Sequence, residues 1–557
     1  MYSSHKNVLQ TVALLKAYGI AHIVISPGSR NIPLIQSFTC DPFFNCWSIV
    51  DERSASYFAI GLIYRVKKPV ALCCTSGSAL LNYAPAVAEA FYHRLPLVVI
   101  SADRSQAWIG QMDGQTINQS GAFGKLANYS VQLPEIHTDD ECWYCNRLIN
   151  EALICCSTPV PGPIHINIPI SEPLFAFTEE RLPDVRCIKA EIPDKSVNMR
   201  SFCDEWNDAH KRMILVGQQF SDPYLTTLLE KLTEKTDSIV LREHLANLPS
   251  SRFIGNFDAL IGRFTTNEIR EFAPDLLITL GGHLVSKKIK TFLREYKPKR
   301  HWHLSAETDV PDTYQSLTQL INVHPVAFLE KLTGLVKADK ERPFAVKWNE
   351  FSHLIPPPTQ LQFSDISVTG RVLNSLPSFS TLIVANSSPV RNIQLFSLKE
   401  QIDVLCNRGT NGIEGSISTA AGYTATGDGL TFLLLGDLSF FHDLSALNNS
   451  YLSGNLRIIL INNGGGGIFQ LLSGLKRSET LESYVTAQHT HSAEAWIKAA
   501  GLTYIQANDE QSLEAGLSEL VKPNAGKCIL LEVFTVAELN KAAFEQYYSS
   551  LTTTNYV

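Results

Sequence analysis

The feature that most constrains this chain is its regular alternation of short apolar segments with segments of helical periodicity. In the first third the apolar segments are AHIVIS, PVALCC, PLVVIS and PIHINIP, accompanied by helical patterns over 5–18, 52–65, 77–92 and 144–157. Short apolar runs bounded by turn residues are typical of strands that are buried on both faces. Alternation of such strands with helices predicts an α/β fold of doubly wound, mainly parallel sheets.

The same pattern recurs in the middle and last thirds of the 557 residues, a length that exceeds what one hydrophobic core supports. The further strand candidates are MILVG, SIVL, DLLITLGG and HWHLS, then TLIVAN, TFLLLGD, LRIILINN and CILLEVF. A charged stretch over 179–196 and a proline-containing stretch over 337–363 are predicted to be linkers. We therefore predict three domains, at 1–180, 195–340 and 360–557, and leave open whether the first and third are duplicates.

Composition and patterning exclude several classes of protein. The formal net charge is −7 and no long basic run is present, which argues against nucleic acid as the main partner. No apolar segment reaches membrane-spanning length, so we expect no integral membrane segment. Polar residues interrupt the amino-terminal helical pattern, which argues against a signal peptide and makes the cytoplasm the expected location.

The 12 cysteines lie mostly in apolar patterns, where cysteine usually acts as a small buried hydrophobe. Cys142 and Cys145 form a single C-x-x-C, and no second ligand pair has zinc-like spacing. We interpret this pair as helix packing, with a redox or zinc role as the alternative.

An unusual segment, INNGGGGIFQ (461–470), follows the strand candidate LRIIL. Glycine lets a ligand approach the main chain, and the amide oxygens of Asn462 and Asn463 suit Mg²⁺. Taken alone, the segment is equally compatible with a metal-phosphate site and with a flexible hairpin or linker.

Upstream of this segment, Gly436 and Asp437 end the strand candidate TFLLLGD, about one strand–helix–strand unit before Asn463. The carboxyl ends of parallel strands meet at one edge of a sheet, where such folds bind ligands. Asp437, Asn463 and the carbonyl of Gly465 would supply oxygen ligands to Mg²⁺ and leave coordination positions for a diphosphate. Two unrelated strand-end turns are the alternative.

The combination GDLS…NNGGGGIF resembles the diphosphate motif of thiamine-diphosphate-dependent enzymes. The resemblance implies a pyrimidine-binding domain at 1–180, a central domain at 195–340 and a diphosphate-binding domain at 360–557. Within this superfamily the chain resembles the synthases of menaquinone biosynthesis. The segments that carry this resemblance are SPGSRNIPL (26–34), DERSASYFAIGL (51–62), TSGSALLNYAPAVAEA (75–90), SADR (101–104), GGHLVSKK (281–288), NSSPVR (386–391) and NRGTNGIEG (407–415).

The resemblance implies roles for individual residues. Glu52 matches the catalytic glutamate that binds the aminopyrimidine ring of the cofactor, although an acidic residue in a first helical turn is also a favourable dipole partner. Ile413 matches the residue that supports the bent cofactor, and a core isoleucine is the plain alternative. The implied cofactor-binding residues are Glu52, Ser387, Arg408, Ile413, Gly436, Asp437, Leu438, Asn463, Gly465, Ile468 and Phe469, with Asp437, Asn463 and Gly465 as metal ligands.

The implied substrates are 2-oxoglutarate, which is decarboxylated, and isochorismate, which accepts the four-carbon unit by conjugate addition. Guanidinium groups bind carboxylates through two hydrogen bonds, so a cation-rich site suits such substrates. Lys288 stands where this family often has arginine, which keeps the charge and loses the planar fork. The implied substrate site comprises Ser29, Arg30, Arg104, Gln115, Lys287, Lys288, Ser387, Arg391, Arg408, Ile468, Phe469 and Leu472.

The resemblance also implies thiamine diphosphate with Mg²⁺, with Mn²⁺ as a substitute, and a homodimer or tetramer whose active site lies at the subunit interface. Two other functions stay open. One is a different thiamine-diphosphate enzyme, such as a 2-oxoacid decarboxylase or an acetohydroxyacid-synthase-like carboligase, which preference for pyruvate would indicate. The other is a nucleotide-binding or regulatory α/β protein without catalysis.

Overall fold

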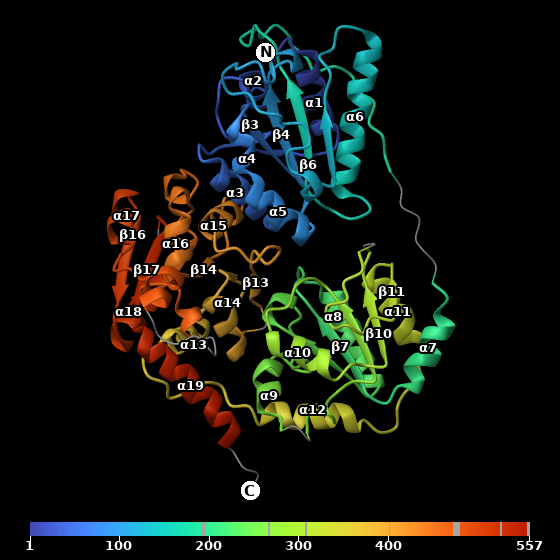
Figure 1. The fold of residues 1–557 in the computed structure, drawn as a ribbon, viewed down its shortest axis with the longest axis vertical. Coiled ribbons are helices and arrows are strands. Elements are labelled where there is room, and N and C mark those ends of the chain that lie inside the picture. Colours follow the sequence, from blue (N-terminus) through green and yellow to red (C-terminus); the bar gives the residue numbers. More distant parts are fainter. Residues whose placement is uncertain are drawn as a thin grey trace.

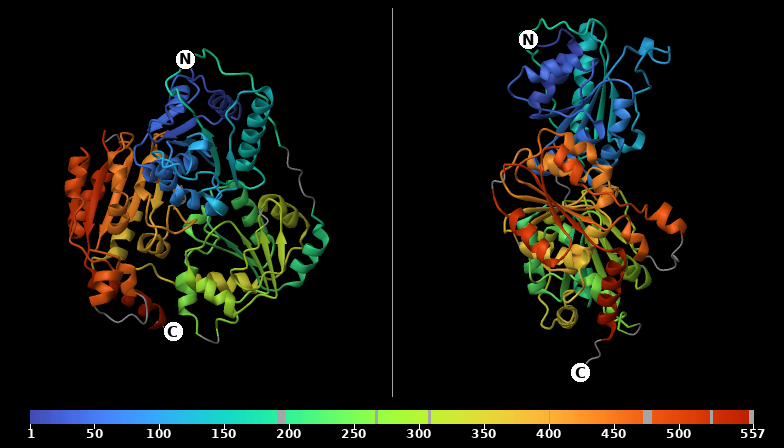
Figure 2. Two further views of the ribbon diagram at one scale, coloured as in Figure 1. Left: turned by 45° about the horizontal axis from the view of Figure 1, so that its top comes forward. Right: turned by 90° about the vertical axis from the view of Figure 1, so that its left-hand side faces the viewer.

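The computed structural model describes residues 1–190, 197–265, 268–306, 309–399, 401–471, 479–523 and 526–553, with burial not described for 470, 471, 552 and 553. Three parallel sheets with helices on their faces confirm the predicted fold class. In Figure 1 the first domain lies at the top, the middle domain at the lower right and the third domain at the left. Both views in Figure 2 also place the first domain above the other two. No helix in the described ranges is long and apolar enough to span a bilayer.

The first sheet has six parallel strands in the order β2-β1-β3-β4-β6-β5. Its strands are β1 (His22–Ile25), β2 (Asn45–Ser48), β3 (Val70–Cys74), β4 (Leu97–Asp103), β5 (Tyr129–Gln132) and β6 (Ile164–Pro169). Its helices are α1 (Lys6–Ala17), α2 (Ile32–Thr39), α3 (Glu52–Val66), α4 (Ser78–Asn82), α5 (Ala84–His93) and α6 (Asp139–Ser157). The last helix begins earlier than the predicted 144 because Thr138 and Glu141 form a capping box.

The middle sheet has five parallel strands in the order β11-β10-β9-β7-β8. Its strands are β7 (Arg212–Val216), β8 (Ser238–Arg242), β9 (Leu276–Leu280), β10 (Arg300–Leu304) and β11 (Gln319–Ile321). Its helices are α7 (Met199–Asp208), α8 (Pro223–Lys235), α9 (Phe257–Arg263), α10 (Lys287–Glu295), α11 (Pro325–Leu335) and α12 (Pro343–His353).

The interval 337–363 is not the unstructured linker predicted from its prolines, because it contains helix α12. Proline at the first helical position is favourable, and Pro343 occupies such a position. The carboxylate of Asp237 accepts hydrogen bonds from the backbone N–H groups of Phe344 and Ala345 at 3.0 and 2.8 Å. The buried ring of Trp348 fixes this helix to the middle domain.

The third sheet has six parallel strands in the order β13-β12-β14-β15-β17-β16. Its strands are β12 (Thr381–Val384), β13 (Asp403–Leu405), β14 (Thr431–Gly436), β15 (Leu456–Asn462), β16 (Thr503–Ala507) and β17 (Ile529–Phe534). Its helices are α13 (Asp365–Ser375), α14 (Ser388–Asn392), α15 (Ser416–Thr424), α16 (Asp437–His442), α17 (Glu494–Ala499), α18 (Glu510–Leu520) and α19 (Ala537–Thr553). Counted from its own first strand, this sheet has the same strand order as the first sheet, so the two domains share one topology.

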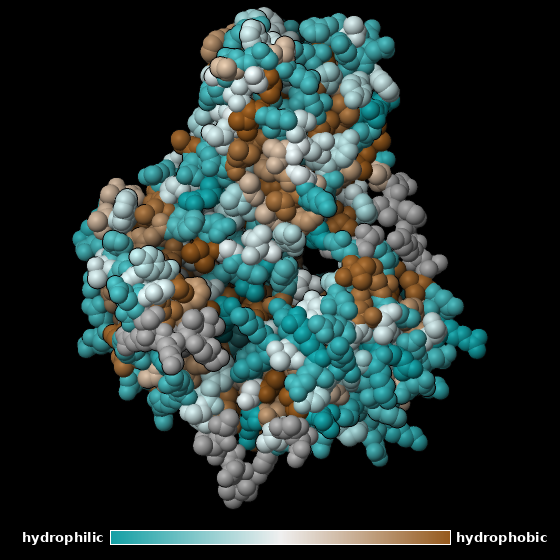
Figure 3. Space-filling view, in the orientation of Figure 1, coloured by the Kyte–Doolittle hydropathy of each residue, from teal (hydrophilic) through white to brown (hydrophobic). Residues whose placement is uncertain are grey.

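The first and third domains pack together through α3 and α15, which are the equivalent helices of the shared topology. Their contact has no room for side chains at two glycines. A Cβ on Gly61 would lie 2.0 Å from the Thr419 carbonyl oxygen, and one on Gly422 would lie 2.0 Å from the Phe58 carbonyl oxygen. One hydrophobic cluster therefore continues from α3 across α15 into the third sheet. By contrast, Figure 3 shows an opening between the first and middle domains on this face.

Candidate active site

Polar side chains gather at the carboxyl edge of the third sheet, where β12, β14 and β15 are neighbours. Asp437 begins α16 directly after β14 and is 3% exposed. Its Oδ2 accepts hydrogen bonds from the backbone N–H groups of Gly465 and Asn463 at 2.9 and 3.2 Å, and its Oδ1 accepts one from Leu438 at 2.7 Å. Burial raises the pKa of this carboxyl group, while the Gly465 amide and the nearby imidazole of His489 oppose the rise.

Asn463 follows β15, and its side chain is held from one side only. Its Nδ2 donates to Asp365 Oδ2 at 2.9 Å, whereas its Oδ1 is buried and has no partner among the described residues. The Oδ1 of Asp365 in turn accepts from Thr535 Oγ1 at 2.6 Å, and Asn540 Oδ1 accepts from the Asp365 backbone N–H at 2.8 Å. This network sets the orientation of the Asn463 amide, with the oxygen directed away from Asp365.

The glycine run after Asn463 packs against the chain's own backbone. Gly464 and Gly465 have φ angles of 78° and 146°, which L side chains rarely adopt. A Cβ on Gly465 would lie 2.7 Å from the Thr486 carbonyl oxygen, and the Gly466 N–H donates to that same oxygen at 2.6 Å. The His489 N–H donates to the Gly464 carbonyl at 3.0 Å. These glycines therefore admit the segment 486–489 close to the strand end, a use that the sequence did not indicate.

The donor set at this edge fits a hard divalent cation. A buried carboxylate (Asp437), an unpartnered amide oxygen (Asn463) and a backbone carbonyl (Gly465) are the oxygen donors that Mg²⁺ prefers. The Gly465 carbonyl also accepts from the Gly467 N–H at 2.9 Å, which leaves its second lone pair available. Across the described ranges no cluster of three histidine, cysteine, aspartate or glutamate side chains offers another metal site.

Two arginines lie at the same sheet edge as Asp437, Asn463 and the Gly465 carbonyl, the three oxygen donors that form the metal-type cluster. Ser387 follows β12 with a φ of 75°, and Arg391 Nη1 donates to the Ser387 carbonyl at 2.6 Å. Arg408 follows β13, is 6% exposed and donates to Asn386 Oδ1 at 2.9 Å. Burial lowers the pKa of Arg391, and the positive charge of Arg408 lowers it further, so the two guanidinium groups are close. Ile413 lies half-buried in the loop after Arg408.

Glu52 lies at the carboxyl edge of the first sheet, as the first residue of α3 after the cap Asp51. Its carboxyl group is half-buried, and no side chain in the described ranges donates a hydrogen bond to it. Burial raises its pKa, and the Asp51 carboxylate adds to the rise. The charge of Glu52 also raises the pKa values of Cys74 and Tyr83, so the carboxyl group faces the end of β3.

The four predicted substrate residues of the first domain share that edge. Ser29 and Gln115 are exposed, and Gln115 has a φ of 55°. Arg30 is 6% exposed, donates to the Ile170 carbonyl at 3.0 Å and lies 3.3 Å from Glu172 Oε1. Arg104 Nε lies 2.9 Å from Asp113 Oδ2 and donates to the Gly114 carbonyl at 3.0 Å. Both arginines are thus paired with acids that an incoming carboxylate would have to displace or join.

Lys287 and Lys288 begin α10 at the carboxyl edge of the middle sheet. Lys287 is exposed, whereas Lys288 Nζ lies 3.6 Å from Asp258 Oδ2 and 4.0 Å from the centre of the Tyr548 ring of α19. Burial lowers the pKa of Lys288, and Asp258 opposes that shift. Lys288 therefore also ties the middle domain to the last helix of the third domain.

Ile468 and Phe469 are half-buried and follow the glycine run, and the predicted contact Leu472 lies outside the described residues. The structure thus groups the predicted residues into two sets. One set lies at the first sheet's edge, and the other comprises residues at the carboxyl edge of the third sheet and at the start of α10 in the middle domain. No contact among the described residues joins Glu52 to Asp437, Asn463 or Arg391. Sequence reasoning missed Asp365 and His489, since neither belongs to a motif with fixed spacing.

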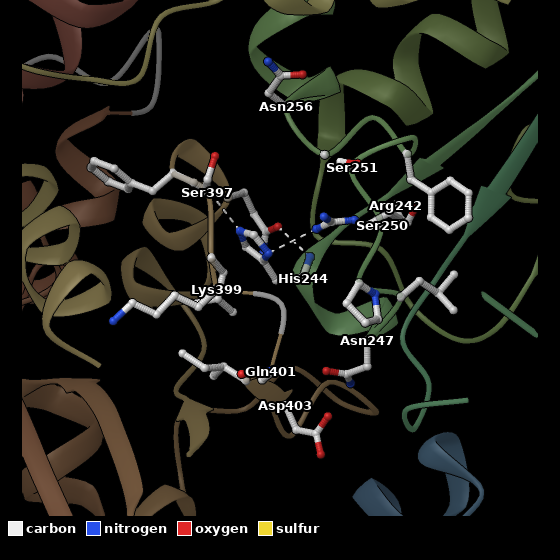
Figure 4. A pocket seen from close by; sticks show the side chains of 18 of the residues that line it. Arg242, His244, Asn247, Ser250, Ser251, Asn256, Ser397, Lys399, Gln401 and Asp403 are labelled. Atoms are coloured by element: carbon white, nitrogen blue, oxygen red, sulfur yellow. Dashed lines mark hydrogen bonds between the residues drawn. The ribbon is translucent and has the colours of Figure 1, made fainter. Parts of the chain in front are cut away.

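A cavity of about 940 Å³ lies elsewhere, between the middle and third domains (Figure 4). None of the predicted site residues lines it. His244 crosses this seam, because its N–H donates to Gln394 Oε1 at 3.1 Å and its Nε2 lies 2.9 Å from the Phe396 carbonyl oxygen. Asn247 crosses it as well, donating to the Val404 carbonyl at 3.0 Å. These bonds fix the middle domain to strand β13 and the segment after α14.

Comparisons with known proteins agree with this architecture. Residues 9–122 match the family model "Thiamine pyrophosphate enzyme, N-terminal TPP binding domain", and residues 184–384 match "Middle domain of thiamine pyrophosphate". The crystal structure of benzoylformate decarboxylase from Polynucleobacter necessarius superposes with a TM-score of 0.71 over 96% of this chain and 99% of that chain. At 14% identity this similarity concerns the fold alone. The fold and the matched domains define a thiamine-pyrophosphate-dependent enzyme.

Full-length relatives define the family. A protein of Phocaeicola vulgatus is 44% identical over 100% of both chains, and one of Bacteroides thetaiotaomicron is 46% identical over 99% of this chain and 100% of its own. Both are named 2-succinyl-5-enolpyruvyl-6-hydroxy-3-cyclohexene-1-carboxylate synthase, as is a Flavobacterium psychrophilum protein that is 41% identical over 97% of this chain and 98% of its own. The chain belongs to the family of 2-succinyl-5-enolpyruvyl-6-hydroxy-3-cyclohexene-1-carboxylate synthases.

Proposed function

We propose that this enzyme decarboxylates 2-oxoglutarate and adds the remaining four-carbon unit to isochorismate, giving 2-succinyl-5-enolpyruvyl-6-hydroxy-3-cyclohexene-1-carboxylate for menaquinone synthesis. The observation that carries the proposal is the similarity, over the whole chain, to several synthases of that name. The cations at the carboxyl edges of all three sheets support it, because both substrates are dicarboxylates.

The third domain would hold the diphosphate end of the cofactor through a divalent cation, Mg²⁺ or Mn²⁺. Asp437, Asn463 and the Gly465 carbonyl would bind that cation, for the reasons of donor chemistry given above. Bound thiamine diphosphate would supply the electron sink for decarboxylation and for formation of the new carbon–carbon bond. Ile413 would support the cofactor, and the remaining implied contacts would be Ser387, Arg408, Gly436, Leu438, Ile468 and Phe469.

The protein's own side chains would handle protons, charge and water. Glu52 would share a proton with the aminopyrimidine ring, a role that suits a carboxyl group whose pKa burial raises. Arg391 and Arg408 would bind substrate carboxylates through paired N–H groups. Half-buried Ile468 and Phe469 would exclude water from the reacting carbons. The remaining substrate contacts in this proposal are Ser29, Arg30, Arg104, Gln115, Lys287, Lys288, Ser387 and Leu472.

A second copy of the chain would complete the site, as a homodimer or tetramer in the cytoplasm. Within one chain the Glu52 carboxyl group has no described side-chain partner, and no described contact joins it to the metal-type cluster. A cofactor held at both ends therefore needs the first-domain edge of one copy against the third-domain edge of another. Sedimentation analysis with and without the cofactor would test this part of the proposal.

The activity is tested by incubating the protein with thiamine diphosphate, Mg²⁺, 2-oxoglutarate and isochorismate, and identifying the product by mass. Release of carbon dioxide with formation of the adduct is expected, and chelation of the metal should abolish both. Replacing 2-oxoglutarate with pyruvate should give little turnover. Preference for pyruvate would refute the substrate assignment while leaving the enzyme class intact.

A further inference from the structure

A buried carboxylate of the middle domain, outside every motif discussed so far, lies beside the proposed substrate cations. Glu243 follows β8 and is 3% exposed. Its Oε2 accepts from the Val285 backbone N–H and its Oε1 from the Ser286 backbone N–H, both at 2.7 Å. These two residues directly precede Lys287, the first residue of α10. One carboxylate thus holds the start of the helix that carries Lys287 and Lys288.

The same turn is held from a second direction. Ser286 caps α10, because its Oγ accepts from the Ile289 backbone N–H at 3.2 Å, and it donates to the Asp258 carboxylate. Asp258 is also the ion-pair partner of Lys288. Glu243, Ser286 and Asp258 therefore form one connected support beneath the two lysines.

Glu243 also lies within the electrostatic reach of the third domain. Burial raises its pKa to about 7, Asp258 adds to the rise and the guanidinium of Arg408 opposes it. Glu243 correspondingly opposes the lowering of the Arg391 pKa. The carboxyl group therefore holds the start of the helix that carries the two lysines and is also within electrostatic range of Arg391 and Arg408.

The backbone around Glu243 is fixed to the third domain. His244, the next residue, bonds to Gln394 and Phe396 across the seam shown in Figure 4, and Asn247 bonds to Val404. Since this segment is fixed to the third domain, any shift of the start of α10 away from Glu243 also moves the lysines relative to Arg391 and Arg408.

We propose that Glu243 is a positioning residue for Lys287 and Lys288. By holding the start of α10, it would place these lysines so that they bind the substrate carboxylates together with Arg391 and Arg408 of the third domain. This inference rests on the proposed function. Glu243 acts through the backbone of residues 285 and 286 rather than by contact with substrate. Small errors in the placement of such cations are costly, because substrate orientation determines much of the rate.

The chain contains a matched control at the other end of β8. Asp237 lies immediately before β8, is 5% exposed, and accepts from the backbone N–H groups of Phe344 and Ala345 at the start of α12. It is thus a buried carboxylate that holds a helix start, at the opposite end of β8 from the site. Asp237→Asn should lower stability without altering substrate use.

The test compares Glu243→Gln, Asp237→Asn, Lys287→Ala and the double variant Glu243→Gln/Lys287→Ala in steady-state kinetics, each with a melting temperature. Glutamine offers one acceptor oxygen instead of two, so one of the two N–H groups loses its partner. Glu243→Gln should lower kcat/KM for at least one substrate about tenfold, mainly through KM, as expected for misplaced binding groups. Asp237→Asn should leave kcat/KM unchanged, because the helix start that it holds lies at the opposite end of β8 from the substrate cations.

The double variant decides between positioning and general loss of stability. If Glu243 acts by positioning the lysines, Glu243→Gln should lower kcat/KM little further once Lys287→Ala is present. The two substitutions would then disturb the same interaction with substrate, so their effects would not add. Full additivity, or an unchanged KM for both substrates in Glu243→Gln, would overturn the inference. Failure of the wild-type protein to consume 2-oxoglutarate and isochorismate would instead refute the proposed function itself.

Discussion

Asp365 is expected to determine how well the enzyme binds the divalent cation of the proposed function, although Asp365 would not touch that cation. Its carboxylate holds Asn463 through the 2.9 Å bond to Nδ2, and this bond leaves the Asn463 oxygen unpartnered at the metal-type cluster. Substitution Asp365→Ala removes the acceptor and frees the amide to rotate. Asp365→Asn keeps the shape and one acceptor oxygen but removes the charge.

The magnitude follows from what each substitution leaves unpaired. In Asp365→Ala, the Asn463 NH₂ group loses its buried partner, which costs about 1–3 kcal/mol of stability. The rotated amide presents its oxygen to the metal less often, and loss of such an outer partner typically weakens metal binding about 10–100-fold. In Asp365→Asn, the amide oxygen can still accept from Asn463 Nδ2, so that bond is kept, whereas the charge and the acceptor of the Thr535 O–H are lost.

The metal affinity of each variant can be measured without an activity assay. Calorimetry follows the binding of thiamine diphosphate at several Mg²⁺ concentrations, and electron paramagnetic resonance follows the binding of Mn²⁺. Both variants lose the charge of Asp365, but only Asp365→Ala loses the acceptor that orients Asn463. The difference in metal affinity between them therefore reports the effect of that orientation. We expect Asp365→Ala to bind the metal at least about tenfold more weakly than Asp365→Asn, the lower end of the effect of outer partners. Equal metal affinity in the two variants would refute the orientation argument.

Three further outcomes follow from the structure. Glu52→Gln should fold and bind cofactor but lose most activity, because the amide cannot share a proton with the aminopyrimidine ring; normal turnover in this variant would remove its assigned role. Gly61→Ala should lower the free energy of unfolding in urea by about 1–3 kcal/mol or more, because its Cβ would lie 2.0 Å from the Thr419 carbonyl oxygen. The control Gly334→Ala in α11 meets open space and should leave that free energy unchanged or raise it. Burial lowers the pKa of His165 from 6.5 to about 4, so its contribution to stability is complete above pH 6.5 and is lost as the pH falls toward 4. Between pH 6.5 and 5 that loss is about 2 kcal/mol, and His165→Asn should flatten the measured dependence of unfolding free energy on pH.

The sequence predicts those features that depend on local patterns, namely the positions of strands and the residues at their ends. Apolar runs predict most of the strands, and the rule that ligands bind at the carboxyl edge of parallel sheets predicts that Asp437 and Asn463 lie close together. The order of the strands could not be read from the pattern, because it depends on which helices cross over each sheet. The shared topology of the first and third domains therefore became visible only in the structure.

The residues that sequence reasoning missed are those whose partners are distant in the chain. Asp365 resembles an ordinary first-turn acid beside the cap Ser364, and only the fold places Asn463 and Thr535 against it. Glu243 stands in the polar segment REHLAN and reads as a surface acid, yet it is buried because the turn before α10 folds over it. The sequence pattern does not predict helix α12, because prolines usually interrupt helices, whereas Pro343 begins this one.

Because the first and third domains share one topology, the same fold would supply both halves of the proposed site. In both domains the turns after the first four strands lie at one sheet edge, in the same order. In the first domain these turns carry Glu52, Arg30 and Arg104, and in the third they carry Asp437 and Asn463. The equivalent helices α3 and α15 join the two domains into one hydrophobic cluster, so each chain positions both edges rigidly. A change that separates α3 from α15 should therefore weaken both halves of the site at once, whereas a change at either edge should affect only the chemistry that this edge supplies.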